Sequence, residues 1–441
     1  MAQWIPSVVL FVLFLINATI KRKLFCLSSI LLLYESLTLA SSVYFSYDPR
    51  VGVPFVSENA MWFLSAAFSL LFGPLLFLRD CQLRVDEALI RQVSVSYDYK
   101  AIAKGLLIVL LPVSIFFFFR GLSGFQEFIV GGGDREAFRE TLDTGVVSNP
   151  IMAFCWFFGA CFYCALFWCV CGFLFWPAHR GANLMLMFAG SLWMFDGIRT
   201  ASRSNIFYSI VFVVSVCLAL RTFFSGKKMR IPKICVCLLL FVCTLFIAMT
   251  IFRFGSNSKE ERGVGYNAFA YFSSGPYCFN ADYELRADGE VPPLNGFLTA
   301  ALGVRILDRV FSGVSYAELA ELHEEYYAPD TEIRRAYQEL CETFSGEFKT
   351  MIGTFILDYS PLVVLVVFAA LFWGTSFLMW RLRPSRLSDA LILSVYVYVL
   401  LTSNIGFVFA TFRGNMAFMG LAFFWCCLRI QEKVLTEGRH E

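Results

Sequence analysis

The chain alternates between long apolar runs and short polar connections along most of its length. Each run holds about 17–25 residues, enough for a helix to cross a hydrocarbon core about 30 Å thick. A helix also satisfies its own backbone hydrogen bonds, as a segment surrounded by lipid must. The pattern therefore predicts eleven membrane-spanning helices, at about 4–20, 24–46, 59–78, 101–119, 150–176, 182–197, 204–220, 231–252, 351–379, 388–410 and 414–430.

The composition favours the same class of protein. Hydrophobic residues make up 58% of the 441 positions and charged residues 16%, and the mean hydropathy is +0.66. Soluble domains have about 45–50% apolar and about 25% charged residues. We expect an all-α polytopic membrane protein. Its predicted parts are an N-terminal bundle of about eight helices (1–252), a large partly helical periplasmic loop (253–350), and about three helices with a short tail (351–441).

Basic residues gather in every second connection between the predicted helices. Under the positive-inside rule these connections are cytoplasmic, which predicts a periplasmic N-terminus and a cytoplasmic C-terminus. No cleavable signal peptide is predicted, because the first apolar run is followed by basic residues and is not preceded by them. The basic residues are Lys21, Arg22, Lys23, Arg79, Arg84, Arg91, Lys100, His179, Arg180, Lys227, Lys228, Arg230, Lys233, Arg381, Arg383, Arg386, Lys433 and Arg439.

Arginines also occur on the predicted outer side, where this rule disfavours them. Arg199 and Arg203 stand four positions apart, a spacing that places both on one face of a helix. A planar guanidinium suits phosphate oxygens, so the group predicts an anion site at the outer face. Alternatively, each arginine reaches out to lipid headgroups. The group comprises Arg199, Arg203, Arg253, Arg262 and Arg413, and the acids near it are Asp196, Glu260 and Glu261.

The predicted outer loop, residues 253–350, has 16 acidic and 9 basic residues. A connection of this length is usually functional. Ser315 and Glu318 are spaced as a helix capping box. The aromatic segment that includes Tyr266 and Tyr271 is suited to stacking on sugar rings. It equally suits anchoring of the loop at the membrane interface.

These features together resemble the O-antigen polymerases, the bacterial oligosaccharide repeat-unit polymerases. The resemblance covers most of the chain by architecture: about eleven helices, one large outer loop late in the chain, and outer-face arginines. The local matches are "RTASRS" at 199–204, "RGVGYNAFAYFSSGP" at 262–276, "NGFLTAALG" at 295–303 and "KTMIGTFILDYSPLVVLVV" at 349–367. In the last match this chain has Ser360 where the family often has a glycine.

The resemblance implies a glycosyltransferase of the bacterial inner membrane that builds O-antigen or a related surface polysaccharide. It would move a chain held on undecaprenyl pyrophosphate onto a fresh lipid-linked repeat unit at the periplasmic face. The candidate catalytic residues are Arg199, Arg203, Arg262, Asp282 and Glu261. The candidate residues for binding pyrophosphate and glycan are Arg253, Arg413, Asp196, Tyr266 and Tyr271.

Arginines can stabilise the departing pyrophosphate without a metal, and we expect neither a metal nor a cofactor. The attacking hydroxyl needs a general base, for which Asp282, Glu261 and Asp196 are candidates. The expected partners are the lipid-linked glycan as donor and acceptor, the lipid bilayer, and a chain-length regulator protein. We expect no nucleic acid.

Two other functions remain open. An O-antigen ligase would use the same donor, and we would expect a catalytic histidine in its outer loop, where this chain has His323 within a charged helix face. A transporter or flippase for an anionic lipid-linked glycan would carry its charges near the middle of the membrane.

Two interpretations also remain open for Glu35, and two for the cysteine pair Cys278 and Cys341. Glu35 lies in the middle of an apolar span, where an acid is either functional or a buried structural contact. Cys278 and Cys341 are the two cysteines of the predicted outer loop. In an oxidising compartment they form a disulfide or stay as separate buried thiols.

Overall fold

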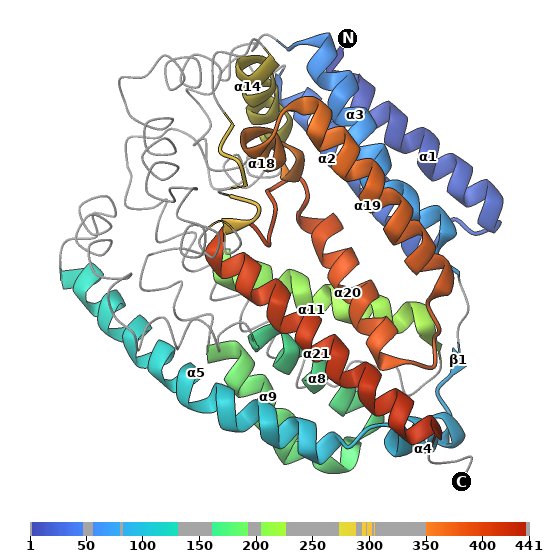
Figure 1. Cartoon of the computed structure of the whole chain (residues 1–441), viewed down its shortest axis with the longest axis vertical. Coiled ribbons are helices and arrows are strands. Elements are labelled where there is room, and N and C mark those ends of the chain that lie inside the picture. The colour runs from blue at the N-terminus through green and yellow to red at the C-terminus, as the bar shows by residue number, and fades with distance from the viewer. Residues whose placement is uncertain are drawn as a thin grey trace. The chain divides into compact units, whose positions relative to one another are not determined.

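The computed structural model describes residues 2–46, 56–79, 83–130, 161–192, 204–225, 273–287, 293–296, 298–301, 304 and 350–437. The chain is mostly helical (Figure 1). Five described helices are long and apolar enough to cross a membrane: Ala2–Lys21, Glu58–Phe77, Tyr99–Ser123, Asn205–Phe223 and Pro361–Arg381. Shorter apolar helices cover Leu27–Val43, Phe162–Phe175 and Leu387–Thr402. The structure supports an all-α membrane protein in a lipid bilayer, and the full set of eleven spans stays a prediction.

The described residues fall into two compact units. The first unit comprises the described residues up to 79, the described residues between 273 and 382, and residues 398–415. Its elements are η1 (Ala2–Trp4), α1 (Ile5–Lys21), α2 (Leu27–Ser46), α3 (Glu58–Phe72), η2 (Gly73–Phe77), α14 (Gly275–Ala287), α18 (Met351–Asp358) and α19 (Pro361–Arg381). The second unit comprises the described residues between 83 and 225, together with residues 383–397 and 416–437. Its elements are β1 (Leu83–Arg84), α4 (Glu87–Ser96), α5 (Tyr99–Val130), α8 (Phe162–Phe175), η4 (Pro177–His179), α9 (Arg180–Leu192), α11 (Ser204–Phe223) and β2 (Phe224–Ser225). The helices α20 (Leu387–Thr402) and α21 (Thr411–Glu437) contribute residues to both units.

In the first unit, α1, α2, α3 and α19 form a bundle, with α14 and α18 at the end where α19 begins (Figure 1). Polar side chains join these apolar helices. The hydroxyls of Ser7 and Ser36 each donate to the backbone oxygen of the other residue, both at 2.9 Å, and so fasten α1 to α2. Asn17 donates to Ser28 and Ser29 at 3.0 and 2.8 Å. Lipid is as apolar as a leucine side chain, so close packing and such hydrogen bonds hold membrane helices together.

The predicted span 351–379 is two helices in the structure. Thr350 starts α18 by accepting a hydrogen bond from the N–H of Gly353 at 2.9 Å. The helix ends at Asp358, and Tyr359 and Ser360 are extended before α19 begins at Pro361. Proline disfavours helical backbone in the residue before it and suits the first position of a helix. Hydropathy alone misses this break, because the residues on both sides of it are apolar.

The predicted span 388–410 also ends early. α20 stops at Thr402 and covers 16 residues. At 1.5 Å per residue this is about 24 Å, which is less than the hydrocarbon core of about 30 Å. A hydrogen-bonded turn follows, in which the N–H groups of Ile405 and Gly406 both donate to the carbonyl of Thr402.

In the second unit, α8 and α9 pack on each other and on α5, and α11 packs on α8 (Figure 1). Aromatic rings fill the junction of α5 with the end of α8. Tyr99 stacks on Trp176 and His179 with ring centroids 5.0 and 5.3 Å apart. Two strands of two residues each, β1 and β2, form a short parallel pair, in which Leu83 lies opposite Phe224.

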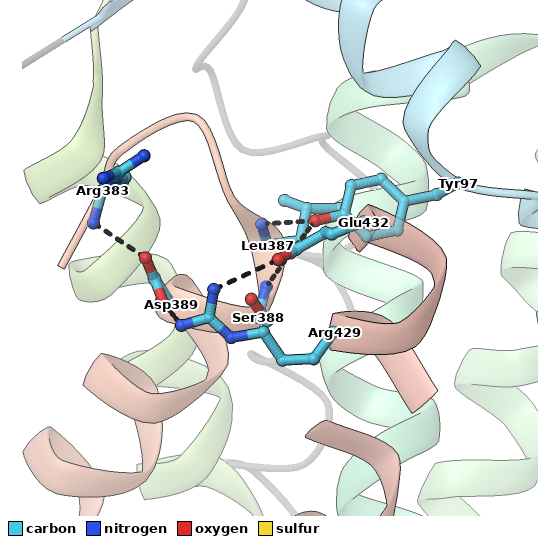
Figure 2. Close-up of polar contacts among 7 residues, drawn as sticks. All are labelled: Tyr97, Arg383, Leu387, Ser388, Asp389, Arg429 and Glu432. Carbon is cyan, nitrogen blue, oxygen red and sulfur yellow. Dashed lines mark hydrogen bonds and ion pairs between the residues drawn. The ribbon is translucent and has the colours of Figure 1, made fainter. Parts of the chain in front are cut away.

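Figure 2 shows the polar contacts that fix the start of α20 within the second unit. The hydroxyl of Tyr97 accepts the N–H of Leu387 at 2.9 Å and donates to Glu432. Glu432 also accepts the N–H of Ser388 at 3.2 Å. Burial, and then the charge of Glu432, raise the pKa of Tyr97, which keeps its phenol proton available for this bond.

Two charged side chains complete this network. Arg429 donates to Asp389 at 2.5 Å, and Asp389 accepts the backbone N–H of Arg383 at 2.8 Å (Figure 2). The Asp389 side chain is only 2% exposed. A buried charge is tolerated when it is paired and hydrogen-bonded, as it is here.

The start of α14 lies against the turn that follows α20, in the first unit. A Cβ atom added at Gly275 would lie 2.4 Å from the carbonyl oxygen of Asn404. No real Cβ approaches a backbone oxygen so closely, so one of the two segments would have to move.

We therefore expect Gly275→Ala to lower the free energy of unfolding, because overpacking a filled site costs about 1–3 kcal/mol. Thermal unfolding of the purified protein in detergent would measure this. Gly374→Ala in α19 is the control, because a Cβ there meets nothing within 4 Å. Equal unfolding temperatures for Gly275→Ala and the parent protein would contradict the close approach.

Candidate functional site

Buried polar side chains gather at one end of the first unit, which we call the polar end. It consists of α14 with the two serines before it, residues 293–304 where described, α18, the start of α19, and the segment 403–415. Its buried polar residues are Ser273, Ser274, Asn280, Asp282, Arg286, Thr354, Asp358, Ser403 and Asn404.

Hydrogen bonds hold α14 against the C-terminal end of α2 and the N-terminal end of α3. The hydroxyl of Tyr277 donates to the carbonyl of Ser42 at 2.6 Å. The hydroxyls of Ser41 and Ser273 lie 2.9 Å apart. At the start of α3, the N–H of Ser57 donates to the side-chain oxygen of Asn280 at 2.8 Å. The polar face of α14 is thus turned into the bundle.

Asp358 joins two segments of the polar end that are distant in sequence. Its carboxylate accepts the N–H of Leu298 at 3.1 and 3.2 Å and the N–H of Thr299 at 2.6 Å. Its backbone carbonyl accepts the N–H of Asn295 at 3.0 Å. Asn295 and Gly296 make the sharp turn before this contact, with φ of 47° and 86°. Asparagine and glycine tolerate this left-handed backbone best.

Arg286 supplies positive charge next to this contact. Its Nε donates to the carbonyl of Ile356 at 3.1 Å, and the residue is 8% exposed. Asp358 lies outside the span Pro361–Arg381. Burial raises the pKa of the Asp358 carboxyl, although hydrogen bonds from Thr299 and the nearby charge of Arg286 oppose the rise.

The start of α21 is tied to the same place. The side-chain N–H₂ of Asn415 donates to the carbonyls of Thr299 at 3.0 Å and Phe409 at 2.7 Å. Arg413 belongs to the first turn of this helix, two residues before Asn415. Its backbone therefore lies beside the polar end, although its side chain is outside what the structure describes.

The polar end brings together described parts of three sequence segments that carry the family resemblance. Ser273, Ser274 and Gly275 close the match at 262–276. The matches at 295–303 and 349–367 are bonded to each other through Asp358. Sequence similarity alone did not require these segments to be in contact.

The two ends of the first unit differ in their polar residues. At the end away from α14, Lys21 donates to the carbonyl of Leu78 at 2.6 Å. There Arg79 also lies over the ring of Trp380, 5.0 Å from its centroid. The ends of α2 and α20 and the starts of α3, α19 and α21, which the charge pattern assigns to the outer side, meet at the polar end. The structure thus groups the helix ends as the charge alternation predicts, while the orientation in the membrane stays a prediction.

The structure places two of the candidate residues from the sequence. Asp282 lies in α14, is 0% exposed, and stands one helical turn before Arg286. Arg413 begins α21. Outside the described residues lie Asp196, Arg199, Arg203, Arg253, Glu261, Arg262, Tyr266, Tyr271 and His323. Cys278 is buried in α14, and Cys341 also lies outside the described residues.

Several residues of the polar end were missed from the sequence. Asp358, Arg286 and Asn415 act through partners 59 to 116 positions away, such as Thr299, which no local pattern reveals. One feature of the sequence does point to Asp358. It is an acid three positions before a proline that starts an apolar helix, so it stands where a helix break is expected.

The second unit contains a hollow. It has a volume of about 450 Å³, and its lining includes Tyr97, Tyr99, Lys100, Trp176 and His179. It contains none of the candidate residues. Among the described residues, no three His, Cys, Asp or Glu side chains are grouped to hold a metal ion.

Comparison with known proteins adds no identity to this picture. No family model, no curated protein and no solved structure matches the chain.

We expect Asp358→Ala to destabilise the polar end, because the N–H groups of Leu298 and Thr299 lose their acceptor. An unsatisfied buried donor costs about 1–3 kcal/mol. Asp358→Asn keeps one acceptor oxygen and should cost less. Thermal unfolding in detergent, with hydrogen exchange at Leu298 and Thr299, would measure both. Unchanged exchange in Asp358→Ala would show that the carboxylate does not hold this turn.

Proposed function

We propose that this protein polymerises undecaprenyl-pyrophosphate-linked oligosaccharide repeat units into O-antigen or a related surface polysaccharide. The reaction is a glycosyl transfer at the periplasmic face of the bacterial inner membrane, with a periplasmic N-terminus and a cytoplasmic C-terminus. The donor and the acceptor are both lipid-linked glycans. A chain-length regulator protein is a further proposed partner.

One observation carries the proposal. The segments that resemble the O-antigen polymerases converge on a single buried polar end, at the helix ends that the charge pattern assigns to the outer side. A glycosyltransferase of this class needs polar groups at the end of the bundle, where the glycan is. A flippase would need them along a path through the membrane.

The proposed reaction assigns two tasks to the chain. A hydroxyl of the acceptor sugar attacks the anomeric carbon of the donor, and the bond from this carbon to the pyrophosphate oxygen breaks. Negative charge grows on the departing lipid pyrophosphate, and guanidinium groups there stabilise it. Arg199, Arg203 and Arg262 hold this leaving group, and Arg253 and Arg413 bind the same anion or its glycan.

The hydroxyl proton goes to a carboxylate. Asp282, Glu261 and Asp196 are the candidate bases. Asp282 is favoured among them because it lies in the polar end, on the same helix as Arg286. Tyr266 and Tyr271 present ring faces on which sugars stack.

Replacing Arg199, Arg203 or Arg262 by lysine should abolish or strongly reduce polymerisation, because an ammonium cannot bind two phosphate oxygens as a planar guanidinium does. Cells that depend on this chain would then carry lipid A core capped with a single repeat unit. Gel analysis of their lipopolysaccharide would show this directly.

Arg91→Lys is the matched control, because Arg91 is an exposed arginine in a predicted cytoplasmic connection. It should leave polymer length unchanged. Normal polymer in all three lysine variants would refute the arginine site. Complete loss of the surface glycan, including the single repeat, from cells that lack this chain would instead indicate a flippase or a ligase.

The purified protein should also form polymer in the presence of a strong chelator, because arginines take the role that a metal would have at the leaving group. The measurement is polymer formation from lipid-linked repeat units with and without chelator. Activity that is lost and then restored by magnesium or manganese would show that a metal is required.

A further inference from the structure

Glu35 is the one acidic residue in the described part of α2, and it is 1% exposed. The other polar residues of this helix hold neighbouring segments. Ser36 is bonded to α1, and Ser41 and Ser42 contact Ser273 and Tyr277. Neither carboxyl oxygen of Glu35 has a well-formed hydrogen bond. Burying such a group without a partner is costly, and a leucine would fit an apolar helix better.

Asn404, in the turn after α20, is also a buried polar residue. It is 2% exposed, and its side-chain nitrogen and oxygen have no well-formed hydrogen bond. The side chains of Asn404 and Ser403 lie within reach of the Glu35 carboxyl. The two buried side chains therefore have complementary donors and acceptors, and each is the natural partner of the other.

The backbone at Asn404 connects the segments of the polar end. Its carbonyl oxygen lies against Gly275, the first residue of α14. The carbonyl of the preceding residue, Ser403, accepts the N–H of Met351 at 2.6 Å and so fixes the start of α18. Further along, the chain turns into α21, whose first turn includes Arg413.

We propose that Glu35 and Asn404 are positioning residues of the transfer site. Their side-chain contact fixes the turn after α20 on α2, and this turn sets the starts of α14 and α21. The assignment rests on the proposed function, because Arg262 precedes α14 in the sequence and Arg413 belongs to the first turn of α21. Neither Glu35 nor Asn404 touches the reacting atoms.

The test compares Glu35→Gln with Glu35→Leu. Glutamine keeps a donor and an acceptor for Asn404, so polymerisation should stay within about twofold of the parent protein. Leucine removes both, and misplacing a site by about 1 Å can cost on the order of a hundredfold in rate. Hydrogen exchange across 403–415 should rise in Glu35→Leu and stay unchanged in Glu35→Gln.

Asn404→Leu should cause the same loss as Glu35→Leu, and the double variant should lose no more than either alone, since contacting residues are not additive. Ser28→Ala is the control. It removes a buried hydrogen bond at the other end of α2, from Asn17 at 3.0 Å, and should polymerise normally. Equal loss in Ser28→Ala would show that activity follows the stability of α2 and not this contact.

Two other results would overturn the assignment. Normal polymer and normal exchange in Glu35→Leu would show that the contact positions nothing. An inactive Glu35→Gln with unchanged exchange would show that the carboxyl itself transfers a proton. If the parent chain forms no polymer at all, the proposed function fails, and the exchange measurements still test the contact between Glu35 and Asn404.

Discussion

Wherever a helix breaks inside a membrane protein, its backbone N–H and C=O groups need new partners, because lipid offers none. The polar end of the first unit is built on this constraint. The chain leaves helical structure after Asp358 and after Thr402, and it turns sharply at Asn295 and Gly296. The freed backbone groups bond to the Asp358 carboxylate, to the carbonyl of Ser403 and to the side chain of Asn415. The same contacts draw distant segments together, so the requirement for hydrogen bonds also shapes the candidate site.

In the second unit, charged and phenolic side chains supply the hydrogen-bond partners that the start of α20 needs. Tyr97 and Glu432 take the first N–H groups of α20, while Asp389 is shared by Arg429 and the backbone of Arg383. Each of these groups has partners that account for its burial, which is the mark of a structural network. Glu35 and Asn404 differ, because their burial is not explained by well-formed hydrogen bonds.

Hydropathy predicted the long helices well and their interruptions poorly. The predicted span 59–78 corresponds to α3 with η2, at Glu58–Phe77, and the predicted span 4–20 to α1, at Ile5–Lys21. In both, polar or charged residues bound a single apolar run. The predicted spans 351–379 and 388–410 failed because Ser360–Pro361 and the turn after Thr402 break helices without interrupting the apolar pattern. Breaks of this kind depend on backbone geometry and on distant partners.

The candidate site shows the same limit of sequence. Asp282 was predicted as a candidate base in the outer loop, and Arg413 as an arginine between the last two predicted spans. The structure places both at the polar end. Asp358 was missed because its partners, Leu298 and Thr299, lie about sixty positions away, and only the folded chain brings them together.

The way Asp358 is bonded also bears on the proposed chemistry. Its carboxylate is occupied by two backbone N–H groups, and the charge of Arg286 is beside it. An acid engaged in this way has few acceptor positions left for a further guanidinium. Under the proposed function, an arginine that binds the pyrophosphate would therefore not be held by Asp358, and its planar group would stay open to the phosphate oxygens. An acid whose oxygens hold the backbone thus does not compete with a phosphate for arginines, and this is compatible with the proposed chemistry.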